Sequence, residues 1–183
     1  MSDRSIRFGV AESPLGLLLV AVTARGACSV RLGASVGELG RGLREEFPSA
    51  TIERDDGGLG PWVAEALRLA RGYAPGLELP LDVPASAFRR RVYGLLRAIP
   101  RGQTRTYAEV ARGLGRPHAA RAVGQACAAN PVALLVPCHR VVPAAGGTGG
   151  YRWGPERKRA LLRAEAADLR VLRDPCRVRS IAR

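Results

Sequence analysis

Alternating apolar and polar or small residues dominate the first third of the chain. Three short segments with this alternation, separated by turn-forming residues, are typical of strands in an antiparallel meander: residues 6–10, 17–22 and 27–32. Apolar positions then change to helical spacing over residues 36–47 and 61–73, and a proline stands at the edge of each helix. The pattern predicts a small α/β unit, and nothing in it identifies a chemical site.

Helical spacing also governs the second half of the chain. An amphipathic helix is predicted over residues 87–99, with arginines along its polar face. Thr106 and Glu109 have the spacing of a capping box, which predicts a helix from residue 107 to about 114. Pro117 suits the first position of a second short helix. Two short helices joined by a glycine-containing turn are typical of a helix-turn-helix.

An apolar run at residues 132–136 leads through Pro137 into the sequence Cys-His-Arg. The run predicts a buried strand that delivers Cys138 and His139 to a site. The unperturbed pKa of a thiol is about 8.5, and a nearby imidazole or arginine cluster lowers it, so Cys138 is a candidate nucleophile. A structural, buried cysteine is the alternative, and it is the commoner case for an isolated Cys-His pair.

Four glycines within residues 146–150 predict a loop, because so many glycines do not form a regular element. The segment lacks the lysine and the serine or threonine of a P-loop, so nucleotide binding has little support. Its position shortly after Cys138 suits a pocket wall made of backbone. A helix is predicted from residue 154 to about 167, and we expect the arginine-rich remainder to be a loosely ordered tail.

Charge is distributed unevenly along the 183 residues, whose formal net charge is +13. Residues 1–83 contain 9 arginines and 11 acidic residues, whereas residues 84–183 contain 20 lysines and arginines against 5 acidic residues. Codon bias in a GC-rich genome would explain a preference for arginine but not this asymmetry. The basic half therefore indicates a polyanionic partner, and nucleic acid is the physical expectation.

Cysteine and histidine usage bears on the compartment and on metal chemistry. The chain has four cysteines and two histidines: Cys28, Cys127, Cys138, Cys176, His118 and His139. They form no CxxC pair and no metal-ligand spacing, so we expect no metal. We expect a reduced cytoplasmic protein, since neither a secretory leader nor an apolar run of membrane-spanning length is evident.

Five ordered motifs resemble those of the O6-alkylguanine-DNA alkyltransferases, most closely the C-terminal half of the bacterial adaptive-response protein. The motifs are TYAEVA (106–111), AARAVG (119–124), NP (130–131), PCHRVV (137–142) and GYRWG (150–154). The resemblance implies an α+β fold in three parts. These are a ribonuclease H-like α/β domain at 1–83, an alkyltransferase domain with a winged helix-turn-helix-like unit at 84–170, and a basic tail at 171–183.

The resemblance implies a DNA repair protein, a methylated-DNA–protein-cysteine methyltransferase that acts once and needs no cofactor. Cys138 would accept the alkyl group, mainly methyl, from O6 of guanine and also from O4 of thymine. His139 would act as a base through a bound water, and Glu165 would hold the imidazole. Tyr107 would assist departure of the purine, and Asn130 would hydrogen-bond across the turn that precedes the cysteine.

The resemblance also implies the DNA contacts and the pocket walls. A monomer in the nucleoid would bind the minor groove of double-stranded DNA and rotate the damaged nucleotide out of the helix, with Arg121 filling the vacated stack. Further DNA-contacting residues would be Arg116, Ala120, Ala122 and Gly124. The substrate pocket would include Val141, Tyr151, Arg152 and Trp153. Trp153 stands where animal relatives carry glycine, which implies a crowded pocket that favours methyl over benzyl groups.

Two other classes of protein stay open. A cysteine hydrolase would use the same Cys-His-Glu set with turnover, but it would need neither a basic half nor a helix-turn-helix. A thiol-sensing DNA-binding protein would use the helix-turn-helix and would keep Cys138 as a redox switch. Stoichiometric methylation of Cys138 by damaged DNA would separate the alkyltransferase from both.

Overall fold

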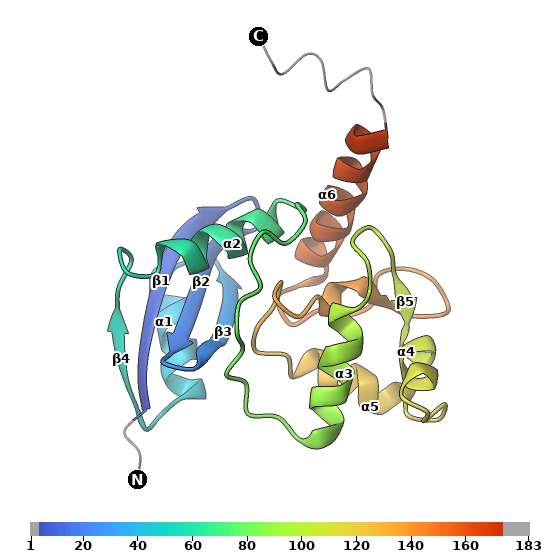
Figure 1. Ribbon diagram of the computed structural model, residues 1–183, viewed down its shortest axis with the longest axis horizontal. Coiled ribbons are helices and arrows are strands. Elements are labelled where there is room, and N and C mark those ends of the chain that lie inside the picture. The colour runs from blue at the N-terminus through green and yellow to red at the C-terminus, as the bar shows by residue number, and fades with distance from the viewer. Residues whose placement is uncertain (1–3, 174–183) are drawn as a thin grey trace.

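The computed structural model describes residues 4–173 (Figure 1). A four-stranded sheet forms the N-terminal region, in the order β3-β2-β1-β4. The strands are β1 (Arg4–Ser13), β2 (Gly16–Thr23), β3 (Gly26–Gly33) and β4 (Ala50–Arg54). The first three pair antiparallel, as the alternation predicts, and β4 pairs parallel with β1. Strand β4 is not among the predicted strands, because it is short and half polar and lies at the sheet edge.

Helices α1 (Val36–Glu46) and α2 (Gly60–Ala70) cover opposite faces of the sheet (Figure 1). Leu19 of β2 belongs to the core cluster that contains Leu43 of α1, whereas its neighbour Leu18 belongs to the cluster beneath α2. Successive side chains of a strand point to opposite faces, so the short alternating strands serve two apolar layers.

The C-terminal region is mainly helical. Its helices are α3 (Ala87–Arg97), α4 (Tyr107–Gly113), α5 (Ala120–Ala128) and α6 (Pro155–Arg173). The predicted capping box of α4 is present, since the Thr106 hydroxyl accepts from the Glu109 amide at 3.2 Å and the Glu109 carboxylate accepts from the Thr106 amide at 2.6 Å. The α+β architecture, a mixed sheet followed by a helical region, is confirmed. None of the helices within residues 4–173 is long and apolar enough to cross a membrane.

Two short strands and one 3₁₀ turn complete the C-terminal region. β5 (Arg105–Thr106) pairs parallel with β6 (Val141–Val142), so the start of α4 lies beside the segment that follows the Cys-His-Arg sequence. The 3₁₀ turn η1 (Cys138–Arg140) contains that sequence. This small sheet was not predicted, because each strand has only two residues.

The strand predicted at residues 132–136 is wrong. Val132 makes a single isolated bridge to Val30, and the Val136 amide donates to the Val132 carbonyl at 3.0 Å, so the segment folds into a turn. Most of its side chains are buried all the same. An apolar run shows that side chains are buried, but it does not show whether the backbone is extended.

Two predicted helix ends also differ from the structure. Helix α5 begins at Ala120 and not at Pro117, because a turn precedes it in which the Ala119 amide donates to the Arg116 carbonyl at 2.9 Å. Helix α6 continues to Arg173, beyond the predicted end near residue 167. The rest of the predicted basic tail, residues 174–183, lies outside the described residues.

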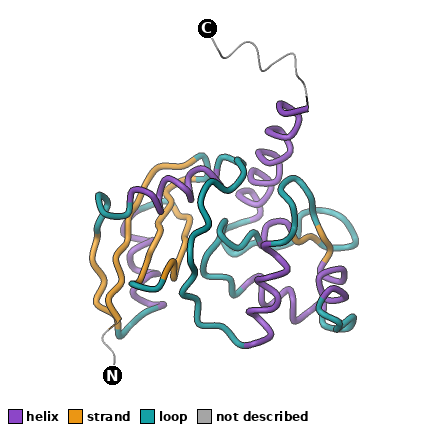
Figure 2. Tube along the Cα trace, in the orientation of Figure 1, coloured by secondary structure: helices purple, strands orange, loops and turns teal. Residues whose placement is uncertain are grey.

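Hydrogen bonds and a shared core join the two regions. The Val30 amide of the edge strand β3 donates to the Pro131 carbonyl at 2.8 Å, and the Arg157 side chain of α6 donates to the Leu15 carbonyl at 2.7 Å. One core cluster contains both Val30 and Val123 of α5. Figure 2 shows long loops running between the sheet and the helices, where they cover the edge strand β3.

Candidate active site

Asn130 organises the turn that leads to Cys138. Its side chain is buried, its Oδ1 accepts from the Val132 amide at 3.1 Å, and its Nδ2 donates to the Val136 carbonyl at 2.8 Å. The same Nδ2 donates to Cys138 Sγ at 3.2 Å. One amide therefore closes the turn and points a hydrogen-bond donor at the sulfur.

The turn carries backbone strain at Leu134. This residue has a φ of +73°, a left-handed conformation that disfavours side chains with a Cβ. Such a residue costs about 1 to 3 kcal/mol and persists where surrounding contacts fix it. The Asn130 hydrogen bonds and the Val30–Pro131 backbone bond supply those contacts, so the cysteine is held in a constrained segment.

Cys138 is a buried thiol in the resting protein. Burial raises the pKa of Cys138, while the Asn130 hydrogen bond and the nearby Lys158 charge act in the opposite direction. Burial outweighs them, so the sulfur is protonated at neutral pH. A nucleophilic role would therefore require a base that accepts the thiol proton as the reaction begins.

His139, the residue that follows Cys138, forms a buried pair with Glu165. His139 Nε2 lies 2.9 Å from Glu165 Oε1, and both side chains are about 3% exposed. Burial lowers the pKa of His139, although its contacts with Glu165 oppose this, so the ring is neutral. Burial alone would raise the pKa of Glu165, but hydrogen bonds from His139 and Arg140 hold it at about 2.

The ionised Glu165 fixes the tautomer of His139. A carboxylate can only accept hydrogen bonds, so Nε2 must carry the ring hydrogen and Nδ1 must carry the lone pair. Nδ1 is buried and has no hydrogen bond to another residue in the described part of the chain. The ring thus keeps an acceptor nitrogen, which is the kind of atom that a general base uses.

A pocket of about 300 Å³ opens at the sulfur. Residues from several separate segments line it: Tyr107, Gly124, Cys127, Ala128, Cys138, Gly150, Tyr151 and Arg152. Burial raises the pKa of Tyr107, and that of Tyr151 even further, so both phenols keep their protons. Burial also raises the pKa of Cys127 to about 12, so this second thiol in the pocket wall is not a competing nucleophile at neutral pH.

Similarity to known proteins extends over most of the chain. Residues 87–167 match the family described as 6-O-methylguanine DNA methyltransferase, DNA binding domain. The methylated-DNA–protein-cysteine methyltransferase of Mycolicibacterium paratuberculosis is 38% identical over 163 residues, which cover 87% of this chain and 92% of that protein. The chain belongs to the O6-methylguanine-DNA methyltransferase family. The resemblance inferred from the five sequence motifs is thereby confirmed.

Other relatives of this methyltransferase family extend the comparison. The bifunctional transcriptional activator/DNA repair enzyme Ada of Escherichia coli is 41% identical over 88% of this chain. That match covers 46% of Ada, so the chain spans about half the length of this relative. A crystal structure of Mycobacterium tuberculosis OGT in complex with DNA has a TM-score of 0.74 and 34% identity, covering 88% of this chain and 93% of that one.

The structure places the other residues expected from the methyltransferase resemblance in two groups. Tyr107, Gly124, Tyr151 and Arg152 line the pocket with Cys138. Val141 is buried beside η1 and Trp153 packs near arginines, 5.9 Å from Arg31 and 5.1 Å from Arg152, and neither lines the pocket. The crowding expected from Trp153 is therefore not a direct contact with the pocket.

The expected DNA-contacting residues lie on and before α5. Arg116 and Arg121 are exposed, and Ala120, Ala122 and Gly124 are half-buried. Arg116 packs 5.8 Å from the centre of the Phe88 ring. Gly124 lies where an added Cβ would touch the Tyr107 ring at 3.8 Å, so the two helices approach closely at the pocket. The small residues of α5 thus allow close helix packing on at least one side.

Two residues near the site were not assigned a role from the sequence. Arg140 contacts Glu165 at 2.8 Å and also donates to the Ile99 carbonyl at 2.7 Å. Lys158 is buried, and its Nζ donates to the Val141 carbonyl at 2.6 Å and to the Gly150 carbonyl at 3.3 Å. Lys158 therefore ties the glycine-rich loop to the segment after Cys138. One available signal was that it is the only lysine in the chain.

Proposed function

We propose that this protein repairs alkylated DNA by moving an alkyl group, mainly methyl, from O6 of guanine to Cys138. Alkylated O4 of thymine is the second substrate. The observation that carries the proposal is the arrangement around the sulfur: Asn130 donates to Sγ at 3.2 Å, the sulfur lines a pocket, and the next residue, His139, pairs with Glu165. Each molecule reacts once, because a thioether has no good leaving group.

Proton transfer begins the proposed reaction. His139 Nδ1, the acceptor nitrogen left by the bond to Glu165, takes the thiol proton directly or through a water molecule. The Asn130 amide and the Lys158 charge then stabilise the thiolate, since both act to lower the pKa of Cys138. The buried thiol is therefore activated by its neighbours and not by exposure.

Carbon–sulfur bond formation follows. The thiolate sulfur attacks the methyl carbon, the bond from that carbon to O6 breaks, and its electron pair remains on the purine. The protonated phenol of Tyr107 lies in the pocket wall and donates toward the departing purine, so the leaving group gains hydrogen-bond stabilisation. Overall, the thiol and O6-methylguanine become a thioether and guanine, and the thiol proton is matched by one gained by the purine.

DNA binding supplies the substrate in this proposal. Residues 84–183 carry most of the positive charge, and the exposed Arg116 and Arg121 flank the small residues at the start of α5. The reacting oxygen lies inside the duplex, so the nucleotide must rotate out, at a cost of a few kcal/mol. Arg121 would occupy the vacated stack in the minor groove, and the flipped base would reach the pocket behind α5.

Intact mass spectrometry after mixing with a duplex containing one O6-methylguanine tests the proposal. We expect one added methyl group per protein on the Cys138 peptide, a matching loss of further activity, and no adduct in Cys138→Ser. The Arg121→Ala variant should repair the duplex more slowly while its reaction with the free base is unchanged. Continued turnover would instead indicate a hydrolase, and absence of any adduct would leave a thiol-sensing DNA-binding protein.

A further inference from the structure

Three consecutive arginines stand in the first turns of α3, and the proposed function uses none of them. Arg89, Arg90 and Arg91 are all exposed. They belong to a stretch of the chain, residues 84–154, that contains 11 arginines and one acidic residue, Glu109. Like charges that are crowded on one surface repel each other, so such a surface is typical of a protein that binds a polyanion.

Two of the three guanidinium groups bind the backbone of this chain. Arg90 donates to the Ala85 carbonyl, and Arg91 donates to the Leu114 carbonyl at 2.9 Å. The Arg89 side chain is different, because it makes no hydrogen bond or ion pair with any residue that the structure describes. A guanidinium has five N–H donors, so those of Arg89 are open to a partner from outside the chain.

The first turns of α3 lie against the helix-turn-helix. Leu114, whose carbonyl accepts the bond from α3, is the residue at which α4 ends. The Phe88 ring at the start of α3 lies 5.8 Å from the guanidinium of Arg116, in the turn before α5. Helix α3 also contacts both α4 and α5 directly (Figure 1). The position of α3 is therefore fixed relative to the two helices that are expected to meet DNA.

Tyr93 indicates the side of α3 on which Arg89 lies. The Tyr93 hydroxyl donates to the Ala126 carbonyl of α5 at 3.3 Å, so this side chain faces α5. Arg89 precedes Tyr93 by four residues, and residues four apart share one face of a helix. Burial raises the pKa of Tyr93, and the Arg89 charge acts in the opposite direction, which agrees with a guanidinium near that phenol. Arg89 is therefore an exposed cation on the α5 side of α3.

We propose that Arg89 binds a phosphate of the DNA backbone, so that α3 extends the DNA-binding surface beyond the helix-turn-helix. The inference rests on the proposed function, because it takes DNA as the partner. Arg116 and Arg121 supply positive charge from the helix-turn-helix, and Arg89 adds a charge from a helix outside that motif. Phosphate contacts position a protein on the duplex without reading its sequence, which suits a repair protein that must act at any site.

Binding of the full chain to a fluorescein-labelled, undamaged duplex at several salt concentrations tests the proposal. The logarithm of the association constant falls linearly with the logarithm of the salt concentration, and each phosphate contact contributes about 0.9 to the slope. Arg89→Gln should reduce the slope by about 0.9 and weaken binding by about threefold to tenfold at 0.1 M salt. Arg89→Lys keeps the charge and should restore most of the slope. Fluorescence anisotropy measures the binding.

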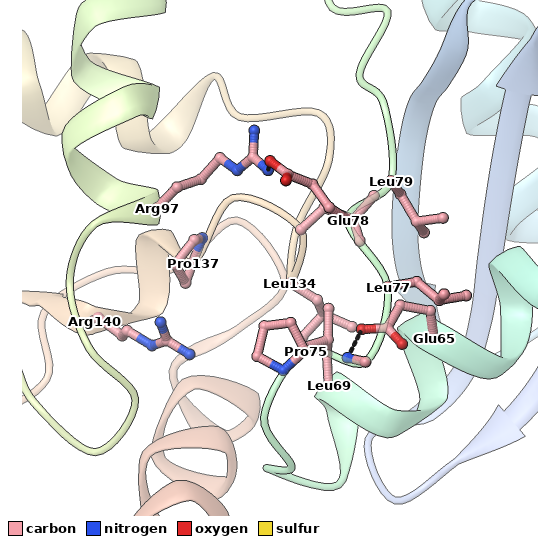
Figure 3. A pocket seen from close by; sticks show the side chains of 12 residues that line it. Glu65, Leu69, Pro75, Leu77, Glu78, Leu79, Arg97, Leu134, Pro137 and Arg140 are labelled. Atoms are coloured by element: carbon pink, nitrogen blue, oxygen red, sulfur yellow. Dashed lines mark hydrogen bonds and ion pairs between the residues drawn. The ribbon is translucent and has the colours of Figure 1, made fainter.

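Arg97→Gln is the matched control, because it removes the same charge from the same helix. Arg97 lies about 12 Å further along α3 than Arg89. Its guanidinium pairs with Glu78 at 2.9 Å, and Figure 3 shows the two side chains together. Since this charge already has a partner within the chain, its removal should change the slope by about 0.2 or less. Arg89→Gln should unfold at the same urea midpoint as the wild type, because its side chain has no partner in the chain to lose.

Three results would overturn the proposal. These are an unchanged slope in Arg89→Gln, an equal reduction in Arg97→Gln, and an equal reduction in Arg89→Lys. Failure of the proposed function would look different. The wild type would then gain no methyl group from damaged DNA, whereas the salt dependence measured on undamaged DNA would still compare the variants.

Discussion

The N-terminal sheet and the C-terminal helices each bury an arginine beside a glutamate, but the two pairs hold different things. Arg31 of β3 lies 2.6 Å from Glu46 and packs 5.9 Å from the centre of the Trp153 ring. Arg140 lies 2.8 Å from Glu165, which also binds His139. The same ionic contact therefore anchors a loop in one region and orients an imidazole beside a thiol in the other.

The two pairs also differ in how far water reaches them. The Glu46 side chain is 23% exposed, whereas the Glu165 side chain is 3% exposed. Water can compensate part of a lost contact at Glu46, but an uncompensated charge at Arg140 would remain buried. The position of each pair relative to Cys138 decides whether the pair can affect the reaction of the thiol. The depth of burial decides how much unfolding free energy is lost when the pair is broken.

The largest contrast should come from removing one carboxylate charge in each region. Glu165→Gln should lower the free energy of unfolding by about 3 kcal/mol, because Arg140 loses its buried counter-ion. It should also slow methyl transfer by about a hundredfold, since the His139 tautomer is no longer fixed. Urea unfolding and single-turnover transfer to Cys138 measure the two effects.

Glu46→Gln is the matched control for that comparison. It should cost about 1 kcal/mol of unfolding free energy and leave the transfer rate unchanged, because Glu46 pairs with Arg31 and is not among the residues that line the pocket. If Glu46→Gln slowed transfer as much as Glu165→Gln, the two pairs would not differ in function. Orientation of His139 by Glu165 would then not explain the slower transfer.

Lowering the pH should reduce the free energy of unfolding in two steps, one from His139 and one from Glu165. Burial lowers the pKa of His139 in the folded protein below its unfolded-state pKa of about 6.5. As the pH falls below about 6.5, the unfolded chain takes up a proton that the folded protein does not, so stability declines. Hydrogen bonds that outweigh burial hold the pKa of Glu165 at about 2, against an ordinary value of 4.5. Its contribution, up to about 3 kcal/mol, is lost as the pH falls from 4.5 toward 2.

Urea unfolding of the wild type between pH 7 and pH 3 measures these steps. The lower step should be missing in Glu165→Gln, because the glutamine amide does not titrate. Retention of the whole acid-induced loss in that variant would place the responsible groups elsewhere in the chain.

A smaller effect should come from the side chain that connects the regions. Arg157 donates to the Leu15 carbonyl at 2.7 Å and to the Trp153 carbonyl at 2.9 Å. Arg157→Met should cost about 1 kcal/mol and slow transfer by about twofold to fivefold, because the loop carrying Arg152 loses a tether. Stability and transfer rate are measured as before.

The control for this change is Arg159→Met on the same helix. Arg159 pairs with Glu156 at the surface, so its loss should change stability by about 0.5 kcal/mol or less and should not alter transfer. Equal effects of the two substitutions would mean that helix charge, and not the tether to the sheet, supports the loop.

Local chemistry made much of the fold predictable. The Thr106–Glu109 capping box predicted the start of α4, because both halves of that interaction lie within one turn of helix. Alternation predicted the first three strands, and the structure pairs them as a meander. Strand β4 was missed because it is a short, half-polar edge strand.

The candidate site was less accessible from local patterns. The segment before Cys138 is apolar like a strand, but it is a turn held by Asn130 and by a bond from Val30. That bond joins residues about one hundred positions apart, so no periodicity could signal it. The roles of Arg140 and Lys158 were missed for the same reason, because their partners lie on other elements.

By itself, the sequence determined the positions of the main helices and of the first three strands, which half carries the positive charge, and which thiol is adjacent to an imidazole. It could do so because capping, periodicity and composition are properties of neighbouring residues. Tertiary structure decided that Cys138 is buried with a raised pKa and that Glu165 is ionised. Burial and pairing depend on residues brought together from distant segments, and these set the charge state of each group.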